Sequence, residues 1–171
     1  KRRTAETDLL DTCILLLNDG SGSMSGDKFQ TTAKASALCN DAFARVLHIP
    51  LCVAAFTTSG PVPVIGIMKG FNETVSDDQM ADRFYDFSGR MSGNNDADSL
   101  LWAFNEIVKR KEKRKVIIVL SDGSPADGLG DPSYALKQTT DTILKDGRVD
   151  LYGIGIMDTN VKRFYPKHKV I

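Results

Sequence analysis

The sequence predicts a Rossmann-like α/β domain of three layers, in which helices cover both faces of a mostly parallel sheet with one antiparallel edge strand. Two observations carry this prediction. Short, nearly continuous apolar runs indicate strands buried on both faces. These runs alternate with longer segments of helical periodicity, which is the pattern of βαβ units. With 171 residues, of which 42% are hydrophobic, the chain is long enough for its own core. We therefore interpret residues 1–171 as a single domain.

The first half of the chain predicts three strands and one long helix. Leu9–Leu17 is a nearly continuous apolar run that ends in Asn-Asp-Gly, and Leu51–Thr57, which follows Pro50, is a second. Val64–Met68 follows Pro63, and because proline is tolerated mainly at sheet edges, we expect an edge strand there. Between the first two strands, apolar residues spaced by three and four predict a helix with one buried face. These residues are Ala35, Leu38, Cys39, Ala42, Val46 and Leu47.

The second half predicts the remaining elements. Asp77–Phe87 fits a helix, and Val116–Leu120 is a strongly apolar strand. A helix over Ser133–Leu144 should end at Gly147, because glycine favours the residue after a helix. Val149–Ile156 is the next strand, and a short helix and the apolar end of the chain follow. A further amphipathic helix is indicated by Leu100, Leu101, Phe104, Ile107 and Val108.

Composition excludes several classes of protein. Lys and Arg together number 22, as do Asp and Glu, so no net charge attracts the chain to nucleic acid or to a membrane surface. No apolar run approaches the roughly 20 residues needed to cross a bilayer. Cys13, Cys39 and Cys52 form neither a disulfide framework nor a zinc pattern, which favours a reducing, cytoplasmic setting. Because the chain begins at Lys1, we expect a fragment of a longer protein.

Oxygen-bearing side chains gather where the predicted strands end. In open α/β sheets, ligands bind beyond the carboxyl ends of the strands. Asp19, Ser21 and Ser23 directly follow the first strand, and the glycines between them permit a tight turn. Hard oxygen ligands of this kind suit Mg²⁺, or another divalent cation such as Mn²⁺ or Ca²⁺.

Two serines and one aspartate bind metal weakly, so the site needs further ligands. Asp122 ends the strand Val116–Leu120 and should reach the same edge of the sheet. A third contribution is expected from Asn94, Asn95 or Asp96, ahead of the helix at Leu100. A cation held by so few charges keeps an open position, which an acidic group of a partner protein would complete.

Other interpretations of these residues assign them a structural role or another known motif. Asp19-Gly20-Ser21-Gly22-Ser23 could be a strand-to-helix turn in which Ser and Asp act as caps. A nucleotide-binding P-loop is disfavoured because Gly26-Asp27-Lys28 lacks the Gly-Lys-Ser/Thr element. A calcium-binding EF-hand is disfavoured by Met24 and Gln30 at its sixth and twelfth positions. The basic run Lys109–Lys115 is typical of a solvated helix end.

The same residues carry a family resemblance. Asp19-Gly20-Ser21-Gly22-Ser23 resembles the Asp-x-Ser-x-Ser signature of the metal-ion-dependent adhesion site in von Willebrand factor A (VWA) domains. Leu120-Ser121-Asp122-Gly123 resembles the later Asp-Gly element of that family. Asp96–Ala103, Gly153–Ile156 and Val161–Tyr165 resemble the C-terminal VWA domain of CobT, a subunit of aerobic cobaltochelatase.

This resemblance implies a function. CobT-like proteins work with a MoxR-type AAA+ ATPase subunit, CobS, in ATP-driven insertion of cobalt into the corrin ring. The domain would dock that ATPase through its metal and would hold no catalytic site itself, although the whole complex is an enzyme. An adhesion or scaffolding VWA domain unrelated to cobalamin synthesis is the alternative. One departure concerns the third metal loop, where most VWA domains have threonine: Asn94 falls nearest to it, and Asp96 is chemically the better ligand.

Overall fold

A computed structural model describes residues 11–128 and 130–171 of the chain. Its centre is a six-stranded sheet in the order β3-β2-β1-β4-β5-β6. Only β3 runs against its neighbour, and the other paired strands are parallel. The strands are β1 (Thr12–Asp19), β2 (Leu51–Ser59), β3 (Val62–Lys69), β4 (Arg114–Ser121), β5 (Asp150–Gly155) and β6 (His168–Val170). The mostly parallel sheet with an antiparallel edge strand is therefore confirmed.

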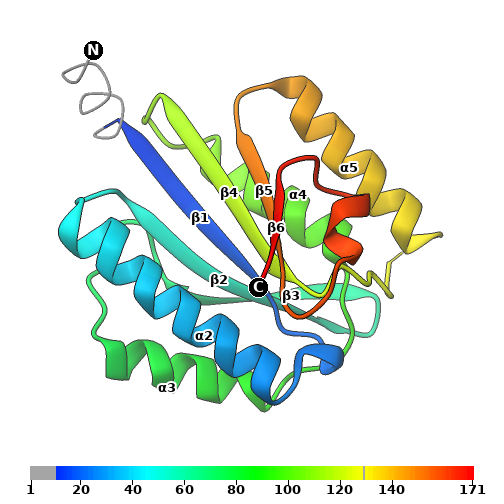
Figure 1. The fold of residues 1–171 in the computed structure, drawn as a ribbon, viewed down its shortest axis with the longest axis horizontal. Coiled ribbons are helices and arrows are strands. Elements are labelled where there is room, and N and C mark those ends of the chain that lie inside the picture. The colour runs from blue at the N-terminus through cyan, green and yellow to red at the C-terminus, as the bar shows by residue number, and fades with distance from the viewer. Residues whose placement is uncertain (1–10, 129) are drawn as a thin grey trace.

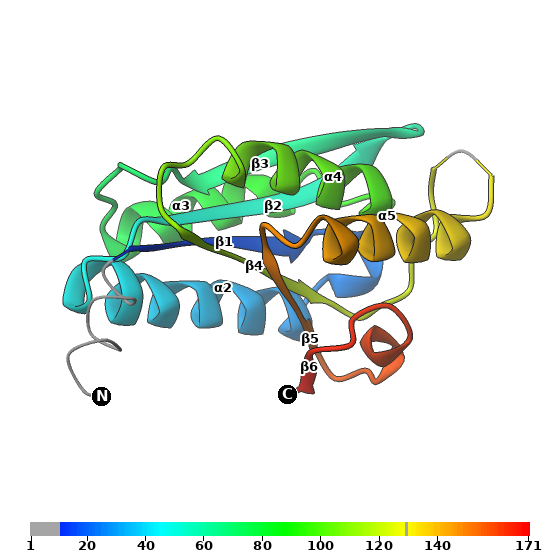
Figure 2. The same cartoon turned by 90° about the horizontal axis from the view of Figure 1, so that it is seen from above.

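Helices cover the two faces of this sheet, as Figures 1 and 2 show. One face packs against α4 (Asp96–Ile107) and α5 (Pro132–Asp146), and the other packs against α2 (Asp27–Cys39) and α3 (Asp77–Ser88). Shorter helical segments are the 3₁₀ turns η1 (Gly22–Met24) and η3 (Asn160–Arg163), and the π-helical segment η2 (Asn40–Val46). Among the described residues, no helix is long and apolar enough to cross a membrane.

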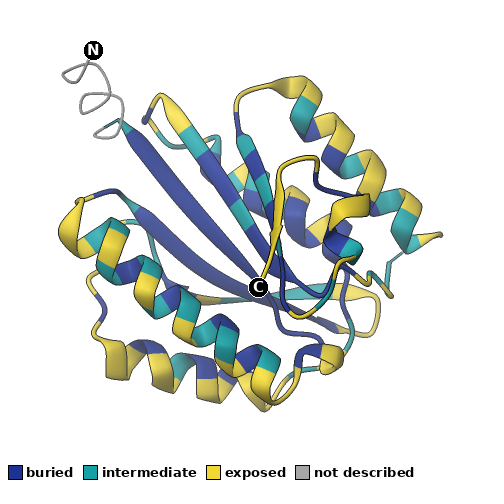
Figure 3. Ribbon diagram, viewed as in Figure 1, coloured by how far each residue is buried: buried dark blue, intermediate teal, exposed yellow. Residues whose placement is uncertain are grey.

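The central strands are buried on both sides, as their continuous apolar runs predicted. All eight residues of β1 are buried, and Figure 3 shows the same for most of β2. Leu15 and Leu17 face the core under α4 and α5, whereas Ile14 and Leu16 face the core under α2. Leu9 and Leu10, which we expected in the first strand, lie outside the described residues.

Local signals account for the helix ends. Ser76 accepts a hydrogen bond from the Gln79 backbone while the Gln79 side chain accepts one from the Ser76 backbone, a capping box that begins α3. Asp131 caps α5, in which Pro132 is the first residue. Gly147 ends that helix with a φ of 76°, as predicted from its position.

The predicted buried face of the first long helix is right only in part, because Ala35 and Cys39 pack against the core but the larger apolar residues do not. Leu38, Val46 and Leu47 are exposed, at 70%, 71% and 42% of their surface. The helix turns a different stripe inward, made of Phe29, Thr32, Ser36 and Asn40. Three of these four are polar, so a search for apolar spacing selects the neighbouring face. Leu101 of α4 is likewise 44% exposed, and Ala103 occupies the core instead.

Candidate metal site at the carboxyl rim of the sheet

Three loops meet where β1, β4 and the start of α4 come together. The register pairs Asn18 of β1 with Leu120 of β4, so the two strands end side by side. The Ser121 hydroxyl donates to Asp19 Oδ2 at 2.8 Å, which joins the two strand ends directly. Ser21 and Ser92 form an isolated bridge, which brings the segment before α4 to the same place.

The Asp-Gly-Ser-Gly-Ser loop turns sharply back over the end of β1. Asp19, which is fully buried, accepts the backbone N–H of Ser21 through Oδ1 at 2.8 Å. The Ser21 and Ser23 hydroxyl oxygens lie 3.0 Å apart. A Cβ at Gly20 would come within 2.9 Å of the Phe56 carbonyl oxygen, so no larger residue fits there without a shift. The loop thus gathers the three oxygen-bearing side chains predicted from the sequence.

Asp122 lies at the end of β4, and only 3% of its surface is exposed. Its Oδ1 accepts the Ser124 backbone N–H at 3.3 Å, and its Oδ2 lies 3.3 Å from Nζ of Lys28 on α2. Gly123 follows with a φ of 70°, in the left-handed region that favours glycine. This turn directs the chain away from the sheet and leaves the Asp122 carboxylate facing α2.

Asp96 is the most unusual residue of the rim. It is the first residue of α4, is 2% exposed, and neither carboxylate oxygen has a hydrogen-bond partner. Burial, and then the negative charges of Asp19 and Asp122, raise its pKa well above the usual range. Burial likewise raises the pKa of Asp19 to about 6. Such uncompensated buried carboxylates are costly unless a cation or a proton accompanies them.

Asn94 and Asn95 hold the loops in place. Asn94 Oδ1 accepts the Ala126 backbone N–H and its Nδ2 donates to the Ser124 carbonyl oxygen, both at 2.9 Å. These bonds fasten the third loop to the segment that follows Asp122. Asn95 Oδ1 caps α4 by accepting the Asp98 backbone N–H at 3.2 Å.

Several residues contribute to the rim without having been predicted as metal ligands. Besides Ser121 and Lys28, these include Thr57, whose hydroxyl accepts the Ser92 N–H and donates to the Gly93 carbonyl. Tyr165 is fully enclosed, and burial together with the charges of Asp96 and Asp19 raises the pKa of its phenol well above the usual range. Thr57 lies near the carboxyl end of β2, where the strand-end rule points, whereas no local pattern marks Tyr165.

The residues that the structure describes include no group of three or more His, Cys, Asp and Glu side chains placed to hold a metal by themselves. A cation at this rim would therefore depend on serine hydroxyls as well as carboxylates. The donor set of Asp19, Ser21, Ser23, Asp96 and Asp122 consists only of oxygens, which is the chemistry that Mg²⁺ and Ca²⁺ prefer. The residues present thus fit a hard divalent cation.

Comparisons with solved structures place this fold among known proteins. The VWA domain of the type V pili tip protein Mfa5 from Porphyromonas gingivalis has a TM-score of 0.66 at 9% identity, covering 94% of this chain and 89% of that one. A von Willebrand factor type A protein from Catenulispora acidiphila scores 0.63 at 17% identity, covering 94% and 38%. Proximal thread matrix protein 1 from the mussel byssus scores 0.63 at 18% identity, covering 90% and 41%.

At these identities the likeness shows a shared VWA fold only. This chain spans about two fifths of the mussel protein. The comparison with protein families is more specific. Residues 84–171, just over half of the chain, match the family described as the cobalamin biosynthesis protein CobT VWA domain. The matched part includes α4, β4 and the Asp96 and Asp122 segments of the rim. The chain therefore belongs to the CobT VWA domain family.

Proposed function

We propose that the domain is a metal-dependent protein-interaction module, in which Asp19, Ser21, Ser23, Asp96 and Asp122 hold one divalent cation, with Mg²⁺ as the first candidate. The observation that supports this most is the Asp96 carboxylate, which is buried beside two other aspartates and has no hydrogen-bond partner. Asn94 already uses its amide to hold the neighbouring loop, so we assign the ligand of the third loop to Asp96.

The bound cation would supply positive charge at the rim and an open coordination position for a carboxylate of a partner. The protein's own residues set up this arrangement. The Ser121 hydroxyl and the Ser21 backbone N–H orient the two oxygens of Asp19. Asn94 fastens the loop before α4 to the segment that follows Asp122. No nucleophile or general base is needed for docking. We propose the cytoplasm as its location and a MoxR-type AAA+ ATPase as its partner, because the family match points to CobT rather than to adhesins.

Calorimetric titration of the whole chain with Mg²⁺ and Mn²⁺ tests the metal site. Wild type should bind one equivalent, and Asp19→Ala and Asp96→Asn should abolish binding. Asp127→Asn is the matched control, because Asp127 lies in the adjacent loop and its side chain accepts the Thr58 hydroxyl. Absence of metal binding by wild type would overturn the proposal.

Docking requires a separate experiment. The purified ATPase of the same cobaltochelatase system should bind the domain in Mg²⁺ and dissociate in chelator, and Asp19→Ala should bind as weakly as chelated wild type. If binding is equal with and without metal, the interaction surface lies elsewhere and the docking role of the rim is wrong.

A further inference from the structure

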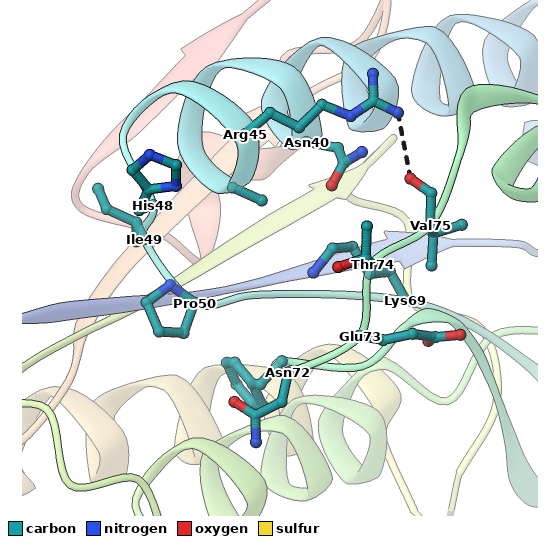
Figure 4. Close-up of a pocket in the computed structure, with 12 residues that line it drawn as sticks. Asn40, Arg45, His48, Ile49, Pro50, Lys69, Asn72, Glu73, Thr74 and Val75 are labelled. Atoms are coloured by element: carbon teal, nitrogen blue, oxygen red, sulfur yellow. Dashed lines mark hydrogen bonds between the residues drawn. The ribbon is translucent and has the colours of Figure 1, made fainter.

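A second cavity lies at the end of the sheet opposite to the candidate metal site. Its volume is about 460 Å³, within the range of small-molecule sites. Its walls come from η2, from the His48–Pro50 segment ahead of β2, and from Lys69–Val75 after β3. Figure 4 shows these side chains around the open space. The start of β2 pairs with the start of β1, whereas Asp19 lies at the other end of β1. The residues of this cavity are therefore separate from the rim described above.

The backbone around the cavity is irregular in two places. Residues Asn40–Val46 form a π-helix instead of continuing α2, and π-helical turns occur frequently at functional sites. His48, which follows it, has a φ of 54°, a conformation that residues with a side chain rarely adopt. Such strain persists only where the surrounding structure enforces it. Both irregularities fall on the same wall.

Asn40 offers an unused amide at this wall. It is 1% exposed, and neither its Nδ2 nor its Oδ1 has a hydrogen-bond partner. Asn18 of β1 shows the normal case: its Nδ2 donates to the Ala54 carbonyl and its Oδ1 accepts the Ser36 hydroxyl. Buried polar atoms are nearly always hydrogen-bonded. We therefore expect the Asn40 amide to bind a partner that donates a hydrogen bond to its Oδ1 and accepts one from its Nδ2.

Lys69 adds a positive charge to the same cavity. It is 3% exposed, and its ammonium donates to the Leu51 and Gly70 carbonyl oxygens at 2.8 and 3.2 Å. An ammonium has three donors, so one remains. Within the described part of the chain, no carboxylate lies at ion-pair distance from Lys69: the nearby Glu73 is bound by Arg83 and by the Gly70 backbone. A buried ammonium without a counter-charge favours an anion.

The remaining walls provide apolar contacts and one further cation, Arg45, which already has partners. Ile49 and Pro50 line one side, and Phe71 lies on another with the Arg110 guanidinium 4.9 Å from its ring centre. Arg45 reaches over the cavity but is already held by Asp41, by Asp77 and by the Val75 carbonyl. Lys69 therefore remains the cation without a partner charge.

We propose that this cavity binds a small organic acid that carries an amide group beside its carboxylate. The carboxylate would accept from Lys69, and the ligand's amide would pair with that of Asn40 through one donated and one accepted hydrogen bond. Ile49, Pro50 and Phe71 would contact the carbon atoms between these groups. The competing explanation is a buried water molecule that satisfies Asn40, as water does for many enclosed polar groups.

N-acetylglycine is the probe, because it combines one amide with one carboxylate. Its binding to the whole chain is followed by amide chemical shifts in NMR titration. Resonances of η2 and of residues 69–75 should move, while those of the Asp19 loop should not. Acetate and N-methylacetamide, each with only one of the two groups, should bind at least tenfold more weakly.

Two variants and one control decide between ligand and water. Asn40→Leu and Lys69→Met should each weaken N-acetylglycine at least tenfold, as expected for losing hydrogen bonds to a charged or buried group. Lys137→Met is the control, since Lys137 pairs with Asp141 on the outside of α5. Asn40→Leu should fold, because it replaces an unpartnered amide by a similar volume of apolar side chain. If wild type shows no shifts at the cavity, or if Asn40→Leu binds as wild type does, the amide is served by water and the proposal is wrong.

Discussion

The helices α2 and α4 pack on opposite faces of the same sheet but by different means. α4 turns Leu100, Ala103 and Ile107 inward, an apolar stripe against the strands. α2 turns Phe29 inward and then the hydroxyls of Thr32 and Ser36, which bond to the Lys28 carbonyl and to Asn18. One helix is therefore held mainly by burial of apolar surface, and the other also by the Ser36–Asn18 hydrogen bond to β1, since the Thr32 bond stays within α2. The polar stripe of α2 runs between the candidate metal site and the cavity at Asn40.

The largest expected effect of a substitution is on the α4 side. Leu100→Ala removes a side chain that is fully buried between α4 and the sheet. Loss of its apolar contacts and the cavity left behind should lower the free energy of unfolding by about 2–5 kcal/mol. Urea unfolding followed by circular dichroism measures this. Leu101→Ala, at a neighbouring exposed position, is the control and should cost far less. Equal losses at the two positions would contradict the assigned helix face.

This contrast explains how far the sequence predicts the fold. Continuous apolar runs identified the strands because the strands are buried on both faces, and the proline residues near Val64 identified the edge strand because proline lacks a backbone N–H for the ladder. Apolar spacing also located α4. For α2 it placed Ala35 and Cys39 against the core but missed Thr32 and Ser36, which are buried because a helix carbonyl and Asn18 accept their hydroxyl hydrogen bonds. Those partners are distant in sequence or lie in the backbone, so no hydrophobic pattern reports them.

The rim of the sheet shows the same limit. The strand-end rule brought Asp19 and Asp122 to one edge, and the Ser121–Asp19 bond agrees with that placement. Spacing left Asn94 and Asp96 as alternatives for the third loop. They differ in chemistry, an amide against a carboxylate, and in their surroundings: Asn94 bonds to the segment after Asp122, whereas the Asp96 carboxylate has no hydrogen-bond partner. Their roles as metal ligands stay predictions until the titration is done.

A medium effect is expected on the α2 side. Ser36→Ala removes the hydroxyl that donates to Asn18 Oδ1 at 3.3 Å, and both residues are fully buried. Asn18 Oδ1 then loses its donor, so the free energy of unfolding should fall by about 1–2 kcal/mol. Ser36→Cys restores the volume but not a strong donor, and should recover little. A loss below the error of urea unfolding would mean that α2, like α4, is held by apolar burial alone.

A smaller and pH-dependent effect is expected where α3 meets the end of β3. Arg83 of α3 bonds to Glu73, and this hydrogen bond, followed by the Gly70 N–H, lowers the Glu73 pKa from 4.5 to about 2. Because the folded pKa is depressed, the stabilisation is complete above about pH 4.5 and is lost as the pH falls toward 2. Both side chains are more than one third exposed, so solvent screening limits the effect to less than about 1 kcal/mol.

The comparison of wild type with Glu73→Gln across this pH range measures that contribution. The difference in urea midpoint should be present at pH 7, shrink below pH 4.5 and vanish near pH 2. Glu106→Gln, which removes an exposed contact with Lys109 on the α4 side, is the control. A difference that persists unchanged at pH 2 would show that Glu73 acts by packing rather than by its charge.

The smallest effect is expected at Leu38, and it tests the orientation of α2 directly. The apolar spacing of the sequence assigns Leu38 to the core, whereas the structure leaves 70% of its surface exposed. Because Leu38 lies on the exposed face of α2, Leu38→Gln should change the free energy of unfolding by no more than about 0.5 kcal/mol, as at other exposed helix positions. If the sequence pattern were correct, the same substitution would bury an unpartnered amide and cost several kcal/mol. One unfolding curve therefore distinguishes a helix that turns its serine and threonine hydroxyls toward the sheet from one that turns its leucine there.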